Sequence, residues 1–146
     1  MKKLIVSFAL MVITLASYAQ VYKMYSTRNY HNQLRLNTMT GEVQQIQDDG
    51  QSWIICSARE ISGDKESRFC LYETQNMWTF ILLDSYNGRL WQVQYSTQDL
   101  DNLFCIPINK DELGSDNEKC IFSIQPLTSM YQYYLINDRT GDMWKF

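Results

Sequence analysis

Histidine, proline and clustered basic residues are scarce in this chain of 146 residues. It has one histidine and two prolines, and its 13 Lys and Arg residues are outnumbered by 16 Asp and Glu. Without a second histidine no His cluster can bind zinc, and we expect neither a metal nor a cofactor. Without a stripe of Lys and Arg, the attraction that nucleic acids and acidic membranes require is absent. The sequence therefore predicts no nucleic-acid partner.

Motifs of common enzyme classes are also missing. No Gly-rich phosphate loop, H-E-x-x-H or G-x-S-x-G is present. The single histidine, His31, falls in a predicted loop, where we expect it to face solvent. Carboxylates gather in predicted loops without the spacing of a calcium loop; they are Asp48, Asp49, Asp99, Asp101, Asp111, Glu112, Asp116 and Glu118. We expect no catalytic residues and no enzyme, with an acid/base pair from these carboxylates as the alternative.

Apolar runs are short, and the longest lies at the N-terminus. Lys2 and Lys3 precede an apolar stretch over residues 4–16, and Ser17-Tyr18-Ala19 has the small residues of a cleavage site. Thirteen apolar residues are too few to span ~30 Å of hydrocarbon. The pattern predicts a signal peptide over residues 1–19, cleaved to leave a single domain over residues 20–146. We expect a periplasmic or secreted protein with no membrane insertion after cleavage, and no lipid anchor because no cysteine follows the cut.

The sequence contains three copies of one repeat. Gly41, Gly88 and Gly141 each sit in a short turn between two apolar segments that align without gaps, 47 and 53 residues apart. Periods of this size are typical of propellers, solenoids and arrays. The repeats cover about residues 21–57, 68–108 and 120–146.

Composition predicts that each repeat is built of strands. Ten Tyr and four Trp accompany short runs punctuated by Gly, Asn and Asp, as in all-β domains. The second repeat predicts four strands, at residues 68–72, 79–84, 89–95 and 103–106, with Trp91, Val93 and Tyr95 on one buried face. The third repeat stops after its third strand. It leaves either an exposed edge or a vacancy for a partner, unless residues 21–25 close the sheet within one chain.

Four cysteines lie in the predicted exported part, which favours disulfides over a metal site. Four cysteines allow three pairings. Repeat symmetry favours Cys56–Cys70 and Cys105–Cys120, because each pair brackets the long polar connection to the next repeat.

The hairpins resemble the tryptophan-docking repeat of quinoprotein-type β-propellers. The resemblance is carried by Leu82-Leu83-Asp84-Ser85-Tyr86-Asn87-Gly88-Arg89-Leu90-Trp91 and by Asp138-Arg139-Thr140-Gly141-Asp142-Met143-Trp144. In the first repeat Gln44 replaces the tryptophan. The resemblance implies an all-β fold of three tandem antiparallel meanders arranged as propeller-like blades, and a β-trefoil, which also has three repeats of four strands, is the alternative.

The exported part also resembles a group of uncharacterised secreted bacterial β-repeat proteins. The second repeat carries this signature over residues 68–78, 80–84 and 91–95. The resemblance implies export and a β-rich repeat, and it brings no known activity.

Aromatic and amide residues share one loop in each repeat, between the first and second strands. The candidate binding residues are Asn29, Tyr30, Asn76, Trp78 and Tyr131. Such residues suit sugar and peptide sites, although Met77 and Trp78 can instead fold back onto their own repeat. We expect a non-catalytic binding or interaction domain whose partner, a protein or a glycan, the sequence does not identify, with a glycan-binding module that uses the loop aromatics as the alternative. The apolar C-terminal edge, residues 144–146, predicts a homodimer.

Overall fold

The computed structural model describes residues 20–114 and 121–146, so the predicted signal peptide and Cys120 lie outside the described residues. The described chain is all-β and forms three antiparallel sheets. The first sheet contains β1 (Tyr22–Ser26), β2 (Asn32–Asn37), β3 (Val43–Gln47) and β4 (Ser52–Cys56); the second contains β5 (Phe69–Glu73), β6 (Thr79–Asp84), β7 (Leu90–Gln94) and β8 (Phe104–Pro107); the third contains β9 (Phe122–Pro126), β10 (Tyr133–Asn137) and β11 (Met143–Lys145). Two short helices, α1 (Ala58–Ile61) and the 3₁₀ turn η1 (Leu100–Asn102), lie in connections.

The central hairpin of every repeat has the same turn. Gly41, Gly88 and Gly141 adopt φ of 79°, 77° and 78°, in the left-handed region that residues with a Cβ rarely enter. Each turn begins at an Asn or Asp whose side-chain oxygen accepts the backbone N–H two residues on, as Asp84 does from Tyr86 at 3.0 Å. The predicted hairpins are therefore confirmed.

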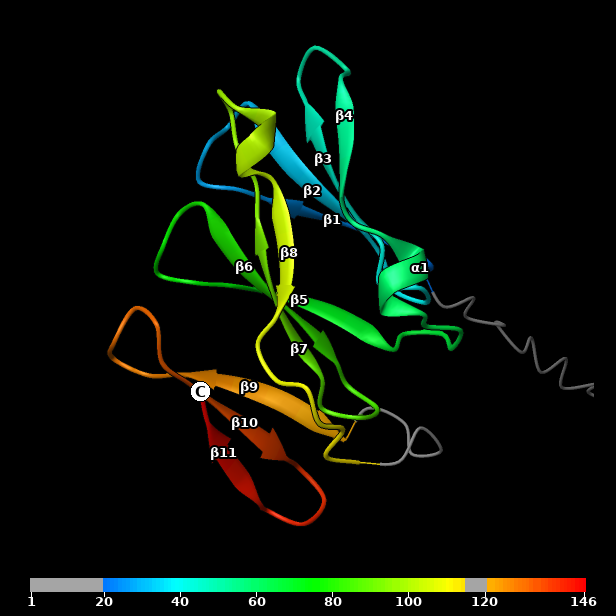
Figure 1. Ribbon diagram of the computed structural model, residues 1–146, viewed down its shortest axis with the longest axis vertical. Coiled ribbons are helices and arrows are strands. Elements are labelled where there is room, and N and C mark those ends of the chain that lie inside the picture. Colours follow the sequence, from blue (N-terminus) through cyan, green and yellow to red (C-terminus); the bar gives the residue numbers. More distant parts are fainter. Residues whose placement is uncertain (1–19, 115–120) are drawn as a thin grey trace, which may run out of the picture.

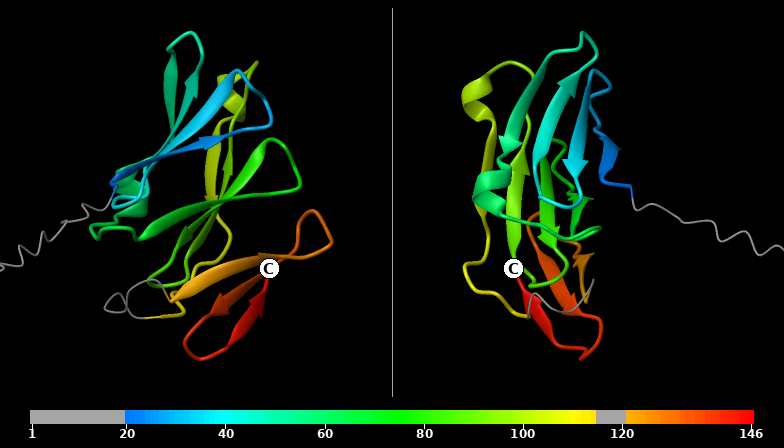
Figure 2. Two further views of the ribbon diagram at one scale, coloured as in Figure 1. Left: turned by 180° about the vertical axis from the view of Figure 1, so that it is seen from behind. Right: turned by 90° about the vertical axis from the view of Figure 1, so that its right-hand side faces the viewer.

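The three sheets stack in chain order, with the first and third sheets at opposite ends (Figure 1). The contact between neighbours repeats, because the N–H of Phe69 donates to the carbonyl of Thr38 at 2.9 Å and the N–H of Phe122 donates to the carbonyl of Ser85 at 3.1 Å. Thr38 and Ser85 hold the same place after their second strands. Each sheet is thus placed on the next in the same way, as the further views indicate (Figure 2). The described sheets form no closed barrel.

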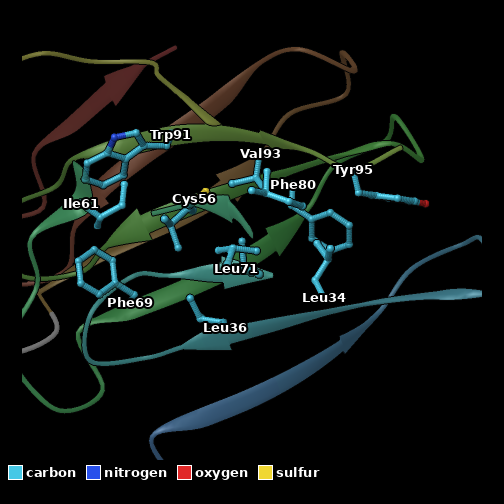
Figure 3. Close-up of a cluster of buried hydrophobic side chains, with 13 residues drawn as sticks. Leu34, Leu36, Cys56, Ile61, Phe69, Leu71, Phe80, Trp91, Val93 and Tyr95 are labelled. Carbon is cyan, nitrogen blue, oxygen red and sulfur yellow. The ribbon is translucent and has the colours of Figure 1, made fainter. Parts of the chain in front are cut away.

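The middle sheet is buried on both faces. Every residue of β6 is buried, whereas the sequence predicted one buried face for this repeat. The physical reason is that alternate side chains of β6 pack on different neighbours: Leu82 on the first sheet and Ile81 and Leu83 on the third. Figure 3 shows the core between the first and second sheets, where Leu34 and Leu36 face Phe69, Leu71 and Trp91.

Trp91 and Trp144 occupy equivalent positions, as predicted. The Trp91 ring lies 6.4 Å from the Phe69 ring, and the Trp144 ring lies 6.1 Å from the Phe122 ring. Trp91 is 7% exposed, while Trp144 is only half-buried. In the first sheet the equivalent Gln44 accepts a hydrogen bond from Arg35 at 2.5 Å on the outer face, so this end of the stack carries polar groups instead of a tryptophan.

The disulfide joins two sheets and not the ends of a loop, so the predicted pairing is wrong. Cys56 on β4 is bonded to Cys105 on β8, with their Cα atoms 5.3 Å apart. The predicted Cys56–Cys70 bond fails because side chains alternate along β5. Phe69 and Leu71 face the first sheet, so Cys70 between them faces away from Cys56. The predicted Cys105–Cys120 bond fails because Cys105 is already paired.

The connection over residues 57–68 is held by packing where a disulfide was expected. Ser57 caps α1 by accepting the N–H of Arg59, and Ile61 at the end of α1 is buried in the core. Gly63 follows, and a Cβ there would lie 2.1 Å from the Phe69 ring. This close approach explains the glycine and fixes the loop on the second sheet.

Candidate functional site

The loops between the first and second strands of each repeat form a row along one side of the stack (Figure 1). Arg28 of the first loop donates through Nη2 to the carbonyl of Thr74 at 3.0 Å and through Nη1 to that of Gln75 at 2.9 Å. The Gln75 side chain in turn donates to the carbonyls of Leu127 at 3.4 Å and Thr128 at 3.3 Å. Arg28 and Gln75 hold the same place in their loops, so the same kind of hydrogen bond, from a long side chain to the backbone carbonyls of the next loop, links each loop to its neighbour.

The asparagines of the candidate site shape these loops. The side-chain oxygen of Asn29 accepts the N–H of His31 at 3.1 Å, and that of Asn76 accepts the N–H of Trp78 at 3.0 Å. This is the turn that Asn forms with its own backbone two residues on. The amide oxygens of Asn29 and Asn76 are thus engaged within the protein, a use that their spacing in the sequence already allowed.

The aromatic candidates are not equivalent. Tyr30 is 84% exposed and Tyr131 is 71% exposed, each on its own loop of the row. Trp78 is half-buried, with its ring 5.4 Å from that of Tyr95. Trp78 therefore folds back onto its own repeat, as one of the two interpretations of the sequence required.

A polar hollow of about 540 Å³ lies beside Trp78, at the far end of β7. Its lining includes Trp78, Gln94, Tyr95, Gln98 and Asn102. The Tyr95 hydroxyl is buried and has no hydrogen-bond partner among the described residues. Asp99 also lines the hollow, but its carboxylate accepts hydrogen bonds from the N–H of Asp101 at 2.9 Å and from Asn102 at 3.2 Å, which stabilise η1.

A second opening, mostly apolar, lies between the second and third sheets. This slot of about 150 Å³ is lined mainly by aliphatic and aromatic side chains from both sheets, with polar groups from Thr74, Thr79 and Gln92. Its apolar lining consists of Ile81, Leu90, Ile108, Ile124, Tyr131, Tyr133, Leu135 and Phe146. Of the candidate binding residues, only Tyr131 lines this slot.

The slot lies next to an unpaired strand edge. Among the described strands β11 pairs only with β10. Tyr133 and Phe146 exchange both backbone hydrogen bonds, at 3.0 and 2.9 Å, so the alternation of an antiparallel ladder turns the backbone groups of Met143 and Lys145 to the free side. The alternative closure by residues 21–25 is absent, because β1 pairs with β2 at the other end of the stack.

The adjacent strand β8 is also uncovered on the side of the third sheet. Ile106 is 49% exposed and Ile108 is 36% exposed. On β4, the corresponding strand of the first sheet, Ile55 and Cys56 are 8% and 0% exposed because β8 covers them. The unpaired edge, the exposed isoleucines and the slot therefore mark one strand-sized opening, which we call the β8–β11 opening. The apolar C-terminal residues indicated the free edge, but no pattern in the sequence indicated the slot.

His31 makes a hydrogen bond to Asp48 at the outer end of the loop row. Its Nδ1 lies 2.5 Å from Oδ2 of Asp48, and this hydrogen bond lowers the pKa of the Asp48 carboxyl from its ordinary value. Both side chains are more than half exposed. The pair fits a surface contact that fastens the loop.

Two further findings concern the described ranges, residues 20–114 and 121–146. They contain no group of three or more His, Cys, Asp or Glu side chains arranged to hold a metal ion. They also contain no helix of the length and hydrophobicity needed to cross a membrane.

Comparisons with known proteins give no relative. No family model matches the chain, and neither a curated protein nor a solved structure matches it.

Proposed function

We propose that this chain is an exported, non-catalytic interaction domain that binds a partner polypeptide at the β8–β11 opening. The observation that carries the proposal is the unpaired edge of β11 next to a slot of about 150 Å³ and two exposed isoleucines. Unpaired edges invite another strand, and proteins normally shorten, charge or cover them. An extended segment that adds to such an edge gains backbone hydrogen bonds, and adjacent pockets select its side chains.

Export is part of the same proposal. The lysines and apolar run of residues 1–19 support a cleaved signal peptide, and the Cys56–Cys105 disulfide is consistent with an oxidising compartment. We place the protein in the periplasm or outside the cell.

We further propose that the three sheets are blades of a propeller-like arrangement, related to secreted β-repeat proteins. Two features support this arrangement over a β-trefoil: each repeat is a meander of neighbouring strands, and the contact from one sheet to the next recurs. A trefoil instead shares its strands in one closed barrel.

A proline in the free edge tests the binding site. Lys145→Pro removes an outward N–H without touching the bonds to β10, so the fold is retained and partner capture from the native envelope is expected to be lost. Met24→Pro is the matched control, because β1 is the edge strand at the opposite end of the stack. Equal capture by both variants contradicts the proposed site.

The partner can also be a second copy of the chain, in a homodimer through the C-terminal edge. Sedimentation of the purified protein at micromolar concentration measures this directly. A dimer that Lys145→Pro converts to monomer assigns the edge to self-association.

Glycan binding is the second candidate, and it is favoured by the hollow beside Trp78. There the half-buried Trp78 lies beside Gln94, Gln98 and Asn102, a combination that suits stacking on a sugar ring and hydrogen bonding to its hydroxyls. Titration with polysaccharides followed by tryptophan fluorescence tests this function. A response that Trp78→Ala abolishes and Lys145→Pro leaves unchanged supports the glycan site over the edge.

A further inference from the structure

We propose that the β8–β11 opening receives an extended segment of another polypeptide as a fourth strand, antiparallel to β11, with an apolar residue opposite Phe146 and another apolar residue two positions earlier. This inference rests on the proposed function and specifies the chemistry of the partner. The first two sheets provide the template for this pairing, because in each of them the chain itself supplies the fourth strand, β4 in the first sheet and β8 in the second.

The template defines which residues of the incoming segment meet the protein. When the repeats are aligned on their turn glycines, Phe146 corresponds to Val93 and Lys145 to Gln92. On β8, Cys105 is opposite Val93 and Ile106 is opposite Gln92. The residue opposite Phe146 is therefore the counterpart of Cys105, and the residue two positions earlier is the counterpart of Leu103, which also packs in the first core.

The backbone of β11 is arranged for this pairing. Its first residue, Met143, corresponds to Leu90, whose carbonyl accepts the N–H of Ile108 at 2.8 Å. The free backbone groups of Met143 and Lys145 are the equivalent donors and acceptors. An incoming strand in the register of β8 thus continues the third sheet without any movement of β10.

The slot provides room for an apolar side chain of the incoming strand. In the first core the corresponding fourth-strand residue is Leu103, which packs against the buried cluster that contains Phe80 and Tyr95. Tyr131 and Tyr133, the counterparts of Trp78 and Phe80, both line the slot. An apolar cavity of about 150 Å³ accommodates a benzene ring.

The disulfide of the template supplies a test of register. Cys56 is paired with Val43, and Ile108 holds the equivalent place opposite Leu90 and lines the slot. Cys56 bonds to Cys105, so a cysteine at position 108 should bond to the counterpart of Cys105 in a bound segment. We therefore use an Ile108→Cys protein and a synthetic peptide that copies residues 102–108, whose single cysteine is that counterpart.

The control peptide exchanges its cysteine with the following isoleucine, which turns the thiol to the other face of the strand. In a glutathione redox buffer we expect the first peptide to give at least about tenfold more mixed disulfide than the control, measured by intact mass. Wild-type protein, which keeps Ile108, corrects for exchange with the native cysteines. Equal yields from the two peptides overturn the proposed register.

Affinity provides the second measurement. Fluorescence anisotropy of the labelled first peptide should show saturable binding to wild-type protein, and the control peptide with the exchanged residues should bind at least about tenfold more weakly. Absence of peptide binding to the wild-type protein overturns this inference. The proposed function is judged separately, by the loss of partner capture in Lys145→Pro. If the wild-type protein captures a partner and Lys145→Pro does not, but the peptide fails to bind, the proposed binding domain is supported and only the proposed strand register is rejected.

Discussion

The interface between the first and second sheets is complete, and the interface between the second and third sheets is not. Among the described residues, the first buries thirteen apolar residues and is closed by the Cys56–Cys105 disulfide, whereas the second buries six and contains the slot. The two share the same sheet-to-sheet contact and the same Phe–Trp pair. The difference lies in the fourth strand, so the molecule itself shows what a strand at the open position adds.

The largest expected effect separates the two tryptophans. Trp91→Ala should lower the free energy of unfolding by ~3–5 kcal/mol, because it leaves a cavity in the complete interface. Trp144→Ala should cost roughly half as much, because the half-buried ring loses less contact. Urea denaturation followed by circular dichroism measures both. Equal losses contradict the claim that the second interface is the less complete one.

The disulfide is the next largest difference between the interfaces. Its two cysteines are 49 residues apart, and loss of the bond in Cys56→Ala/Cys105→Ala should destabilise by about 4 kcal/mol in the chain-entropy account. Non-reducing peptide mapping should first find residue 56 linked to residue 105. A peptide that joins 56 to 70 contradicts the arrangement of the first two sheets.

Local structure was predictable from the sequence, and the relation between repeats was only partly so. The expected strand at residues 79–84 is β6 to the residue, and the turn glycines have the expected positive φ. These features depend on side-chain alternation and turn chemistry within a few residues. The burial of both faces of β6 depends on the third sheet, which no short pattern encodes.

The cysteine pairing illustrates a conflict between two sequence signals. Repeat symmetry placed Cys56 with Cys70, but the alternation of Phe69, Cys70 and Leu71 already placed the Cys70 side chain on the face away from the first sheet. Strand alternation is the stronger constraint, because a disulfide requires Cα atoms within about 7 Å and side chains directed at each other. The hydrogen bonds between neighbouring loops had a weaker signal in the sequence. That signal was the presence of Arg28 and Gln75, two side chains with long hydrogen-bond donors, at matching positions of their loops.

The loop row offers a smaller comparison of the same two interfaces. Arg28→Ala should destabilise by about 1 kcal/mol, since it removes two hydrogen bonds of 2.9 and 3.0 Å to the second repeat. Gln75→Ala should cost about half as much, because its two bonds to the third repeat are longer, at 3.4 and 3.3 Å. Chemical denaturation of the two variants tests this order, and a larger loss for Gln75→Ala reverses the comparison. Arg28→Lys is the control that keeps the charge without the forked geometry.

The smallest expected effect concerns the position that holds His31, Trp78 and Tyr131 in the three loops. The first repeat fastens this residue by the His31–Asp48 pair, the second packs Trp78 on Tyr95, and the third leaves Tyr131 exposed.

Because the pKa of Asp48 is lowered from 3.8 in the folded state, the pair stabilises the fold above that pH and loses its contribution as the pH falls through the lowered pKa. Asp48→Asn should therefore be slightly less stable than the wild type near neutral pH, and the difference should vanish in strong acid. Denaturation midpoints measured over this pH range, with and without added salt, test the claim, since an exposed pair is also screened by salt. A stability difference that persists at the acidic end means that Asp48 acts through the backbone of its turn, and the first loop is then held by the same local hydrogen bonds as the other two.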